Sequence, residues 1–252
     1  MPRKEIKIDL VVHDLKSPLA VVQTGIESLL NFQDVYGALS AKQERILRRI
    51  LRNTRGTQLM VEDILELGRS EEGKVCLKSL TLGDMVHQSL VELFDLVDTN
   101  ESESIREQTD LVSMRSAAQQ AGLDLEFSQN DWQRTLTMDL CKVKQILRNL
   151  LSNAFKFRRN RVTLCGVVEA GSLRLCVTDD GDGIPAAYHQ KIFECYFQVD
   201  TEDIWIRRGH GLGLAGVMLL LEDLGGTLHL VSDTGQGAAF TVCLPLPDAG
   251  GA

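Results

Sequence analysis

Apolar residues in the first part of the chain recur at alternating spacings of four and three. They are Ile8, Val12, Leu15, Leu19, Val22, Ile26 and Leu29. This a/d heptad stripe predicts one long amphipathic helix, and a second helix with the same rhythm follows Ser40, a suitable N-cap residue. Two helices alone cannot bury stripes this wide. The pattern therefore predicts that two copies of the chain pair into a four-helix bundle.

The pattern changes after about residue 80. Short β-type runs at 123–127, 134–138, 161–168, 173–179, 227–232 and 238–246 alternate with helical segments near 83–94, 139–157 and 211–224. This order predicts a sheet with helices on one face, and with the helical hairpin it gives an α+β fold class. We expect a helical domain at 1–70, a linker at 71–79 and an α/β sandwich domain at 80–247.

One segment of the second domain is polar and mostly acidic. Residues 95–114 read "DLVDTNESESIREQTDLVSM". Without them, the flanking segments join into one amphipathic helix. We interpret the segment as an acidic insert, a mobile or partly ordered excursion from that helix. A solvated acidic loop without a role is the favoured alternative.

Composition narrows the possible functions. The chain has 252 residues, with 35 Asp and Glu against 27 Lys and Arg, and a net charge of −8. This acidic balance argues against nucleic-acid binding. The sequence contains no run of 18 apolar residues, so it predicts no membrane-spanning helix. The six cysteines are scattered without a CxxC pair, which predicts reduced, mostly buried thiols.

The first helix carries the first candidate chemistry. His13, Asp14 and Ser17 fall outside its apolar stripe, and His13 and Ser17, four residues apart, share one predicted solvent face. A histidine beside an acid can act as a nucleophile whose proton has an acceptor. An ordinary surface histidine is the alternative. Pro18 predicts a kink one turn later, either a tolerated defect or a hinge.

The segment "QILRNLLSNAFKF" at 145–157 places two amides on one helical face. Asn149 and Asn153 are four residues apart, and their oxygens could hold Mg²⁺; Lys156 could reach phosphate oxygens. Two polar residues facing solvent are the alternative. The leucines of the segment lie on the opposite side, which is therefore the core.

Two glycine-rich turns follow. In "VTDDGDGIP", Asp179 ends a strand and could accept a hydrogen bond from an adenine amino group, while Gly181 and Gly183 permit a tight turn close to a ligand. Alone, this motif is also typical of a surface turn. In "GHGLGLAGV", Gly209, Gly211 and Gly213 open a helix, a position suited to polyphosphate.

In order, these motifs resemble those of two-component sensor histidine kinases. "HDLKSPL" is similar to the H-box, and the three segments just quoted are similar to the N, G1 and G2 boxes of the Bergerat-type ATPase domain. "IFECYFQVD" at 192–200 is similar to the F-box. The resemblance covers nearly the whole chain except the insert.

The resemblance implies a role for each residue. His13 would be the phosphoacceptor, Asp14 its acid/base partner, and Ser17 the residue that orients water for phosphatase activity. Asn153 would hold Mg²⁺ with help from Asn149, and Asp179 would recognise adenine. The remaining ATP-binding residues implied are Lys156, Phe157, Gly181, Gly183, Arg207, Arg208, Gly209, Gly211, Leu212 and Gly213, with a lid at 195–208.

The function that the resemblance implies is an ATP-dependent protein-histidine kinase. It would autophosphorylate His13 from Mg-ATP, pass the phosphoryl group to a response-regulator receiver domain, and show weak phosphatase activity. The alternative is a degenerate kinase that serves as a dimeric scaffold or phosphotransfer protein. We expect a cytoplasmic homodimer. Because only 12 residues precede His13, we also expect a piece of a longer receptor or a signal delivered through a partner.

Overall fold

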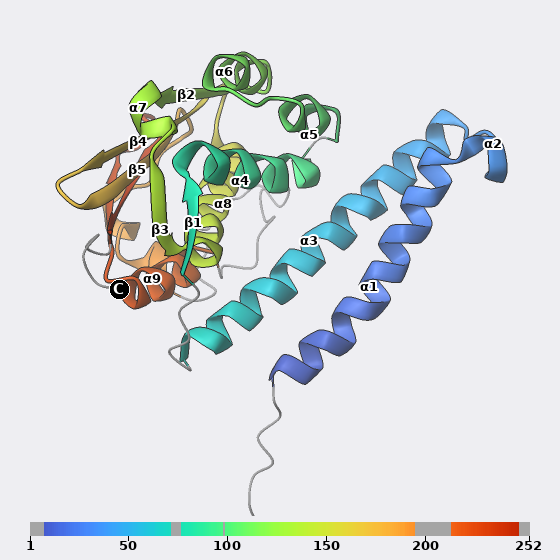
Figure 1. Cartoon of the computed structure of the whole chain (residues 1–252), viewed down its shortest axis with the longest axis horizontal. Coiled ribbons are helices and arrows are strands. Elements are labelled where there is room, and N and C mark those ends of the chain that lie inside the picture. Colours follow the sequence, from blue (N-terminus) through green and yellow to red (C-terminus); the bar gives the residue numbers. More distant parts are fainter. Residues whose placement is uncertain (1–7, 72–76, 98, 195–212, 247–252) are drawn as a thin grey trace, which may run out of the picture. The chain divides into compact units, whose positions relative to one another are not determined.

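The computed structural model describes residues 8–71, 77–97, 99–194 and 213–246 (Figure 1). The chain divides into two compact units. The first comprises residues 1–72 and 94–99, and the second comprises 73–93 and 100–252.

The first unit is a helical hairpin. Helix α1 (Ile8–Asn31) and helix α3 (Ala41–Glu71) pack against each other, with the short α2 (Gln33–Tyr36) between them in sequence. The predicted cap at Ser40 is present. Ser40 Oγ accepts a hydrogen bond from the Gln43 N–H at 3.3 Å, and the Ser40 N–H donates to Gln43 Oε1 at 2.9 Å. This reciprocal pair fixes where α3 begins.

The hairpin buries only part of its apolar stripes. Ile26, Leu51 and Val61 are buried between the helices. Four other stripe residues stay exposed, by 46% at Leu15, 44% at Val22, 41% at Ile46 and 40% at Ile50. Two helices therefore leave an apolar surface open, as the width of the stripes predicts.

The second unit is built on a five-stranded sheet with the order β2-β4-β5-β7-β6. Strands β2 and β4 are parallel, and the other neighbours are antiparallel. The strands are β2 (Leu123–Phe127), β4 (Val162–Glu169), β5 (Ser172–Asp179), β6 (Thr227–Ser232) and β7 (Ala238–Pro245). All five match runs predicted from the sequence, and a helical hairpin followed by a mixed sheet domain confirms the α+β class.

Helices supply the other layer of this unit. They are α4 (Leu82–Val97), α6 (Leu111–Gln120), α7 (Gln129–Trp132), α8 (Leu140–Phe157) and α9 (Gly213–Asp223). Helix α8 packs on β4 and β5, α9 on β6, and α6 on β2 (Figure 1). Alternate residues of β4, β5 and β7 are buried against this layer, and those between them keep solvent contact.

One boundary differs from the sequence prediction. Strand β1 (Leu77–Thr81) pairs antiparallel with β3 (Thr135–Asp139), so the predicted linker at 71–79 ends in a strand. The run "LKSLT" is short and half polar, and it gains its conformation from pairing with β3, 58 residues away at Ser79 and Thr137. The local sequence pattern therefore could not predict that this segment forms a strand.

The acidic insert is helical and packed, which corrects the expectations of a mobile or partly ordered excursion and of a solvated loop. It contains α5 (Thr99–Arg106) and the start of α6, and Ile105, Leu111 and Met114 are at most 1% exposed. The Asp110 carboxylate caps α6 by accepting hydrogen bonds from the N–H groups of Val112 and Ser113. A few well-spaced apolar residues and one good cap are sufficient here, despite the acidic composition.

The cysteines also differ from expectation. Cys141 is exposed, and Cys165, Cys176 and Cys243 are half-buried, so the prediction of mostly buried thiols is wrong for these four. Among the residues that the structure describes, no helix has both the length and the apolar character needed to cross a membrane.

Candidate nucleotide site

Helix α8 presents two amides beside the sheet. Its apolar side is buried through Leu147, Leu150 and Leu151. Asn149 and Asn153, four residues apart, are half-buried on another side. Within the part of the chain that the structure describes, neither amide side chain has a hydrogen-bond partner, so both oxygens are available to a ligand.

The start of helix α9 lies against Asn149. A Cβ placed on Gly213 would lie 3.7 Å from Asn149 Oδ1, which brings the segments predicted as the N and G2 boxes together. An ion pair braces the two helices, because Lys142 Nζ of α8 lies 2.9 Å from Asp223 Oδ2 of α9. The Lys142 side chain is only 2% exposed. Its charge therefore depends on that carboxylate for compensation.

Asp179 ends strand β5 with a buried carboxyl group. The side chain is 8% exposed, and its Oδ1 accepts a hydrogen bond from the Gly181 N–H at 2.9 Å. Burial raises the pKa of Asp179, and the neighbouring Asp180 adds to that effect, while hydrogen bonds from the Gly181 and Ala238 N–H groups oppose it. The position therefore holds a buried acceptor that is oriented by two backbone N–H groups and is chemically suited to accept from an amino group.

The turn after Asp179 needs glycine at two positions. A Cβ on Gly181 would collide with the backbone oxygen of Phe157, so this turn lies against the C-terminal end of α8. Gly183 has a φ of +71°, and a Cβ there would collide with the backbone oxygen of Asp233. The first approach places the predicted G1 turn next to the helix that carries the two amides, and the second places it against the connection between β6 and β7.

Asp180 holds the same two segments together. Its Oδ1 accepts hydrogen bonds from three successive N–H groups that follow α8, those of Arg159 at 2.9 Å, Asn160 at 3.0 Å and Arg161 at 3.1 Å. These bonds, that from Asn160 most of all, lower the pKa of Asp180. The sequence interpretation missed this residue. The only signal was a second acid directly after Asp179.

Lys156 and Phe157 end helix α8 with exposed side chains. The Lys156 ammonium lies 4.6 Å from the centroid of the Phe157 ring, and Phe157 is 48% exposed. The ammonium group and the ring are therefore in contact, and both side chains are exposed to solvent, where a ligand could bind them.

The other predicted site residues lie in the helical unit or outside the described residues. Asp14 and Ser17 are exposed on α1, in the helical unit. His13 lies in α1, but its side chain falls outside the description. Arg207, Arg208, Gly209, Gly211 and Leu212, and the whole predicted lid at 195–208, also lie outside the described residues.

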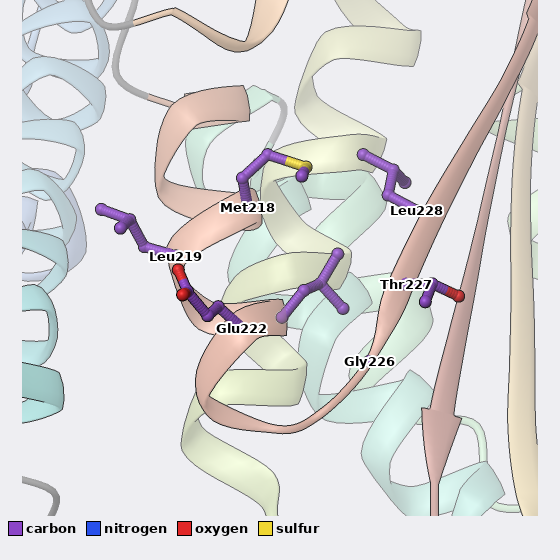
Figure 2. Close-up of a pocket in the computed structure, with 7 residues that line it drawn as sticks. Met218, Leu219, Glu222, Gly226, Thr227 and Leu228 are labelled. Carbon is purple, nitrogen blue, oxygen red and sulfur yellow. The ribbon is translucent and has the colours of Figure 1, made fainter.

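A hollow of about 350 Å³ lies between α9 and β6 (Figure 2). Its lining is largely apolar, with Met218 and Leu219 of α9 and Leu228 of β6. None of the residues predicted to bind nucleotide belongs to its lining. It is therefore separate from the site on α8 and β5.

The fold and these residues define a class, the Bergerat-type ATPases. Residues 138–248 match the family model described as the histidine kinase-, DNA gyrase B- and HSP90-like ATPase, and residues 8–73 match the His Kinase A (phospho-acceptor) domain. The two matched ranges lie in the order that the sequence motifs indicate. The chain belongs to the two-component sensor histidine kinases, as a catalytic core.

Curated proteins that are similar in sequence to this chain are also histidine kinases. The chain is 31% identical over 240 residues to the circadian input-output histidine kinase CikA of Synechococcus elongatus, covering 92% of this chain and 29% of that protein. It is 29% identical over 245 residues to hybrid signal transduction histidine kinase D of Dictyostelium discoideum, covering 94% of this chain and 14% of that protein. The chain thus spans less than a third of either relative.

A solved structure supports the fold. The crystal structure of full-length ShkA in complex with AMPPNP aligns with a TM-score of 0.61 and 24% identity, covering 96% of this chain and 46% of that one. At this identity the likeness concerns the fold alone.

Proposed function

We propose that the chain is an ATP-dependent protein-histidine kinase that phosphorylates its own His13. The observation that carries the proposal is the meeting of Asp179, Gly181 and the end of α8 in one site, with the half-buried Asn149 and Asn153 on the same helix. Matches to both the phosphoacceptor and the ATPase families support it.

The residues present fit Mg-ATP. Asp179 is a buried acceptor for the adenine amino group, and the Lys156 ammonium is exposed and open to phosphate oxygens. The amide oxygens of Asn153 and Asn149 are hard ligands that Mg²⁺ accepts. When bound, Mg²⁺ neutralises negative charge on the phosphates.

The chain's own groups would carry out the transfer. A neutral imidazole nitrogen of His13 attacks the γ-phosphorus, an N–P bond forms, and the bond from phosphorus to the β,γ-bridging oxygen breaks as ADP leaves. Asp14, exposed on the same helix, would accept the ring proton that His13 loses. Positioning and charge neutralisation account for most of such catalysis.

The proposal includes two partners. The exposed Leu15, Val22, Ile46 and Ile50 favour pairing of two hairpins into a four-helix bundle, which we infer to be the homodimer. The phosphoryl group on His13 would then pass to an aspartate of a response-regulator receiver domain. The names of hybrid kinases among the relatives support a partner of this kind.

Labelling tests the proposal directly. We expect protein incubated with γ-labelled Mg-ATP to gain phosphate that is lost in acid and retained in base, because a phosphoramidate is acid-labile. His13→Gln should abolish the label, whereas His229→Gln, at an exposed histidine on β6, should leave it unchanged. Asn153→Asp should impair transfer through Mg²⁺.

Two results would contradict the assignment. Label that persists in His13→Gln would exclude His13 as the acceptor. Wild-type protein that binds Mg-ATP but never gains label would favour the scaffold alternative.

A further inference from the structure

Two cysteines face each other across neighbouring strands, outside the nucleotide site. Cys165 of β4 is directly opposite Cys176 of β5 in the antiparallel register. Their sequence neighbours Leu164 and Val177 are buried under the helices, whereas both cysteines are half-buried on the other face of the sheet. Both thiols therefore remain within reach of small solutes.

The register places the two sulfurs within bonding reach. Directly opposed residues of an antiparallel pair have Cα atoms about 4.5–5.5 Å apart. A disulfide spans Cα separations of about 4.4–6.8 Å. A bond between them therefore needs side-chain rotation but no change of strand pairing.

Neighbouring hydroxyl groups make the two thiols unequal. Cys176 Sγ lies 3.6 Å from Thr178 Oγ1, and Thr241 of β7 is opposite Cys176 on its other side. Hydrogen bonds from Cys165, Thr241 and Thr178 lower the pKa of Cys176, although burial and Glu126 oppose them. The hydrogen bond to Cys176, together with burial, raises the pKa of Cys165.

We propose that Cys165 and Cys176 form a redox site, which a hydroperoxide oxidises to an intrachain disulfide. The Cys176 thiolate attacks one peroxide oxygen, the O–O bond breaks, and Cys176 becomes a sulfenic acid while water or an alcohol leaves. The Cys165 thiol then attacks the Cys176 sulfur, the S–S bond forms, the S–O bond breaks, and the hydroxyl group leaves as water with the proton of the thiol. Two thiols are oxidised by two electrons, and one peroxide is reduced.

This assignment gives each cysteine a distinct role. Cys176 is the attacking residue because the thiolate is the nucleophilic form of cysteine. Cys165 is the resolving residue, because it is the direct register partner of Cys176 and so lies opposite the sulfenic acid. The site is separate from the chemistry at His13.

Peptide mapping tests the proposal on the full chain. Reduced protein is treated with hydrogen peroxide, alkylated, digested without reduction and analysed by mass spectrometry. We expect a peptide that links Cys165 to Cys176, loss of two alkylatable thiols, and recovery with dithiothreitol. Cys243→Ser is the matched control, because Cys243 lies on the same face but opposite Arg174. The linked peptide should persist in it.

Single variants test the order of the two steps. In Cys165→Ser, dimedone should trap a sulfenic acid at Cys176. In Cys176→Ser, labelling at Cys165 should be slower, because burial still raises the pKa of that thiol and leaves less of it as thiolate. Circular dichroism confirms that each variant is folded. Oxidation of either cysteine without a link between them, or equal labelling of the two variants, would overturn the proposal.

Discussion

The buried carboxylate of Asp179 accepts a hydrogen bond from the Gly181 N–H at 2.9 Å, so one of its oxygens is occupied by the protein itself. The Ala238 N–H also donates to this carboxyl group, and the adenine amino group would add a further hydrogen bond. In Asp179→Asn the amide oxygen can keep the bond to Gly181, but the amide NH₂ then meets the adenine amino group, and two donors face each other. We expect calorimetry to show loss of ATP binding. Normal binding would refute the adenine role.

Asp179→Asn should weaken ATP binding but should not lower the stability of the folded protein. Because burial raises the pKa of Asp179, the unfolded chain ionises this group more readily than the folded protein does. The folded state therefore loses stability as pH rises from the ordinary aspartate pKa through the raised one, and the penalty persists above it. We expect Asp179→Asn to melt at the same or a higher temperature than wild type at neutral pH. The two melting temperatures should converge in acid.

The second prediction concerns Asp180. It accepts three N–H groups from the segment after α8, and these bonds lower its pKa. Its stabilising effect is therefore present above the ordinary aspartate pKa and is lost as pH falls through the lowered one. Asp180→Ala should cost about 1–2 kcal/mol of unfolding free energy at neutral pH and weaken ATP binding.

A neighbouring acid provides the control for Asp180. Asp182 also lies in the turn, but its side chain is 89% exposed and pairs at the surface with Arg159. Asp182→Ala should change the unfolding free energy by at most about 0.5 kcal/mol in urea titrations. Equal losses in the two variants would show that the three N–H bonds of Asp180 have no special role.

The third prediction concerns the folded insert. Ile105 is fully buried, so Ile105→Ala should cost about 2–5 kcal/mol of unfolding free energy. Val112 is 72% exposed in the neighbouring helix, and Val112→Ala should lie within about 0.5 kcal/mol of wild type. Deletion of 95–114 should abolish the cooperative melting transition. A deletion variant that melts like wild type would show that the insert is dispensable.

Periodicity and motif order made much of this molecule predictable. The heptad stripe located the two long helices, and alternating patterns located all five strands of the main sheet, because each reports which face of an element is buried. The placement of Asp179 at the end of a strand and of Asn149 and Asn153 in one helix was predicted from residue spacing, and their roles in nucleotide binding stay predictions.

The features that were missed depend on partners distant in sequence. Strand β1 takes its conformation from β3, and Asp180 acts through a loop 19–21 residues earlier. The helices of the insert are held by Ile105, Leu111 and Met114, whose burial cannot be read from an acidic composition. The opposed cysteines likewise appear only when the register of β4 and β5 is known.

The last prediction concerns Ser17, four residues after His13 and exposed on α1. Residues four apart lie on one helical face, so the Ser17 hydroxyl is suited to orient a water for attack on a phosphorylated receiver aspartate. Serine lacks the methyl group that restricts χ1 of threonine, so the hydroxyl is less well fixed. Orientation contributes strongly to such steps, and we expect a phosphatase activity that is present but weak.

Two variants should separate this activity from the kinase reaction. Ser17→Ala should reduce decay of a phosphorylated response regulator, measured with ADP present, and spare autophosphorylation. Asp14→Asn should slow autophosphorylation by about 10²–10⁴-fold and spare that decay, because it removes the proton acceptor. Ser28→Ala is the control, since the Ser28 hydroxyl donates to the Thr24 carbonyl within α1 and is not available to orient water. If regulator decay is equal with Ser17→Ala and wild type, Ser17 is only a solvated helix residue.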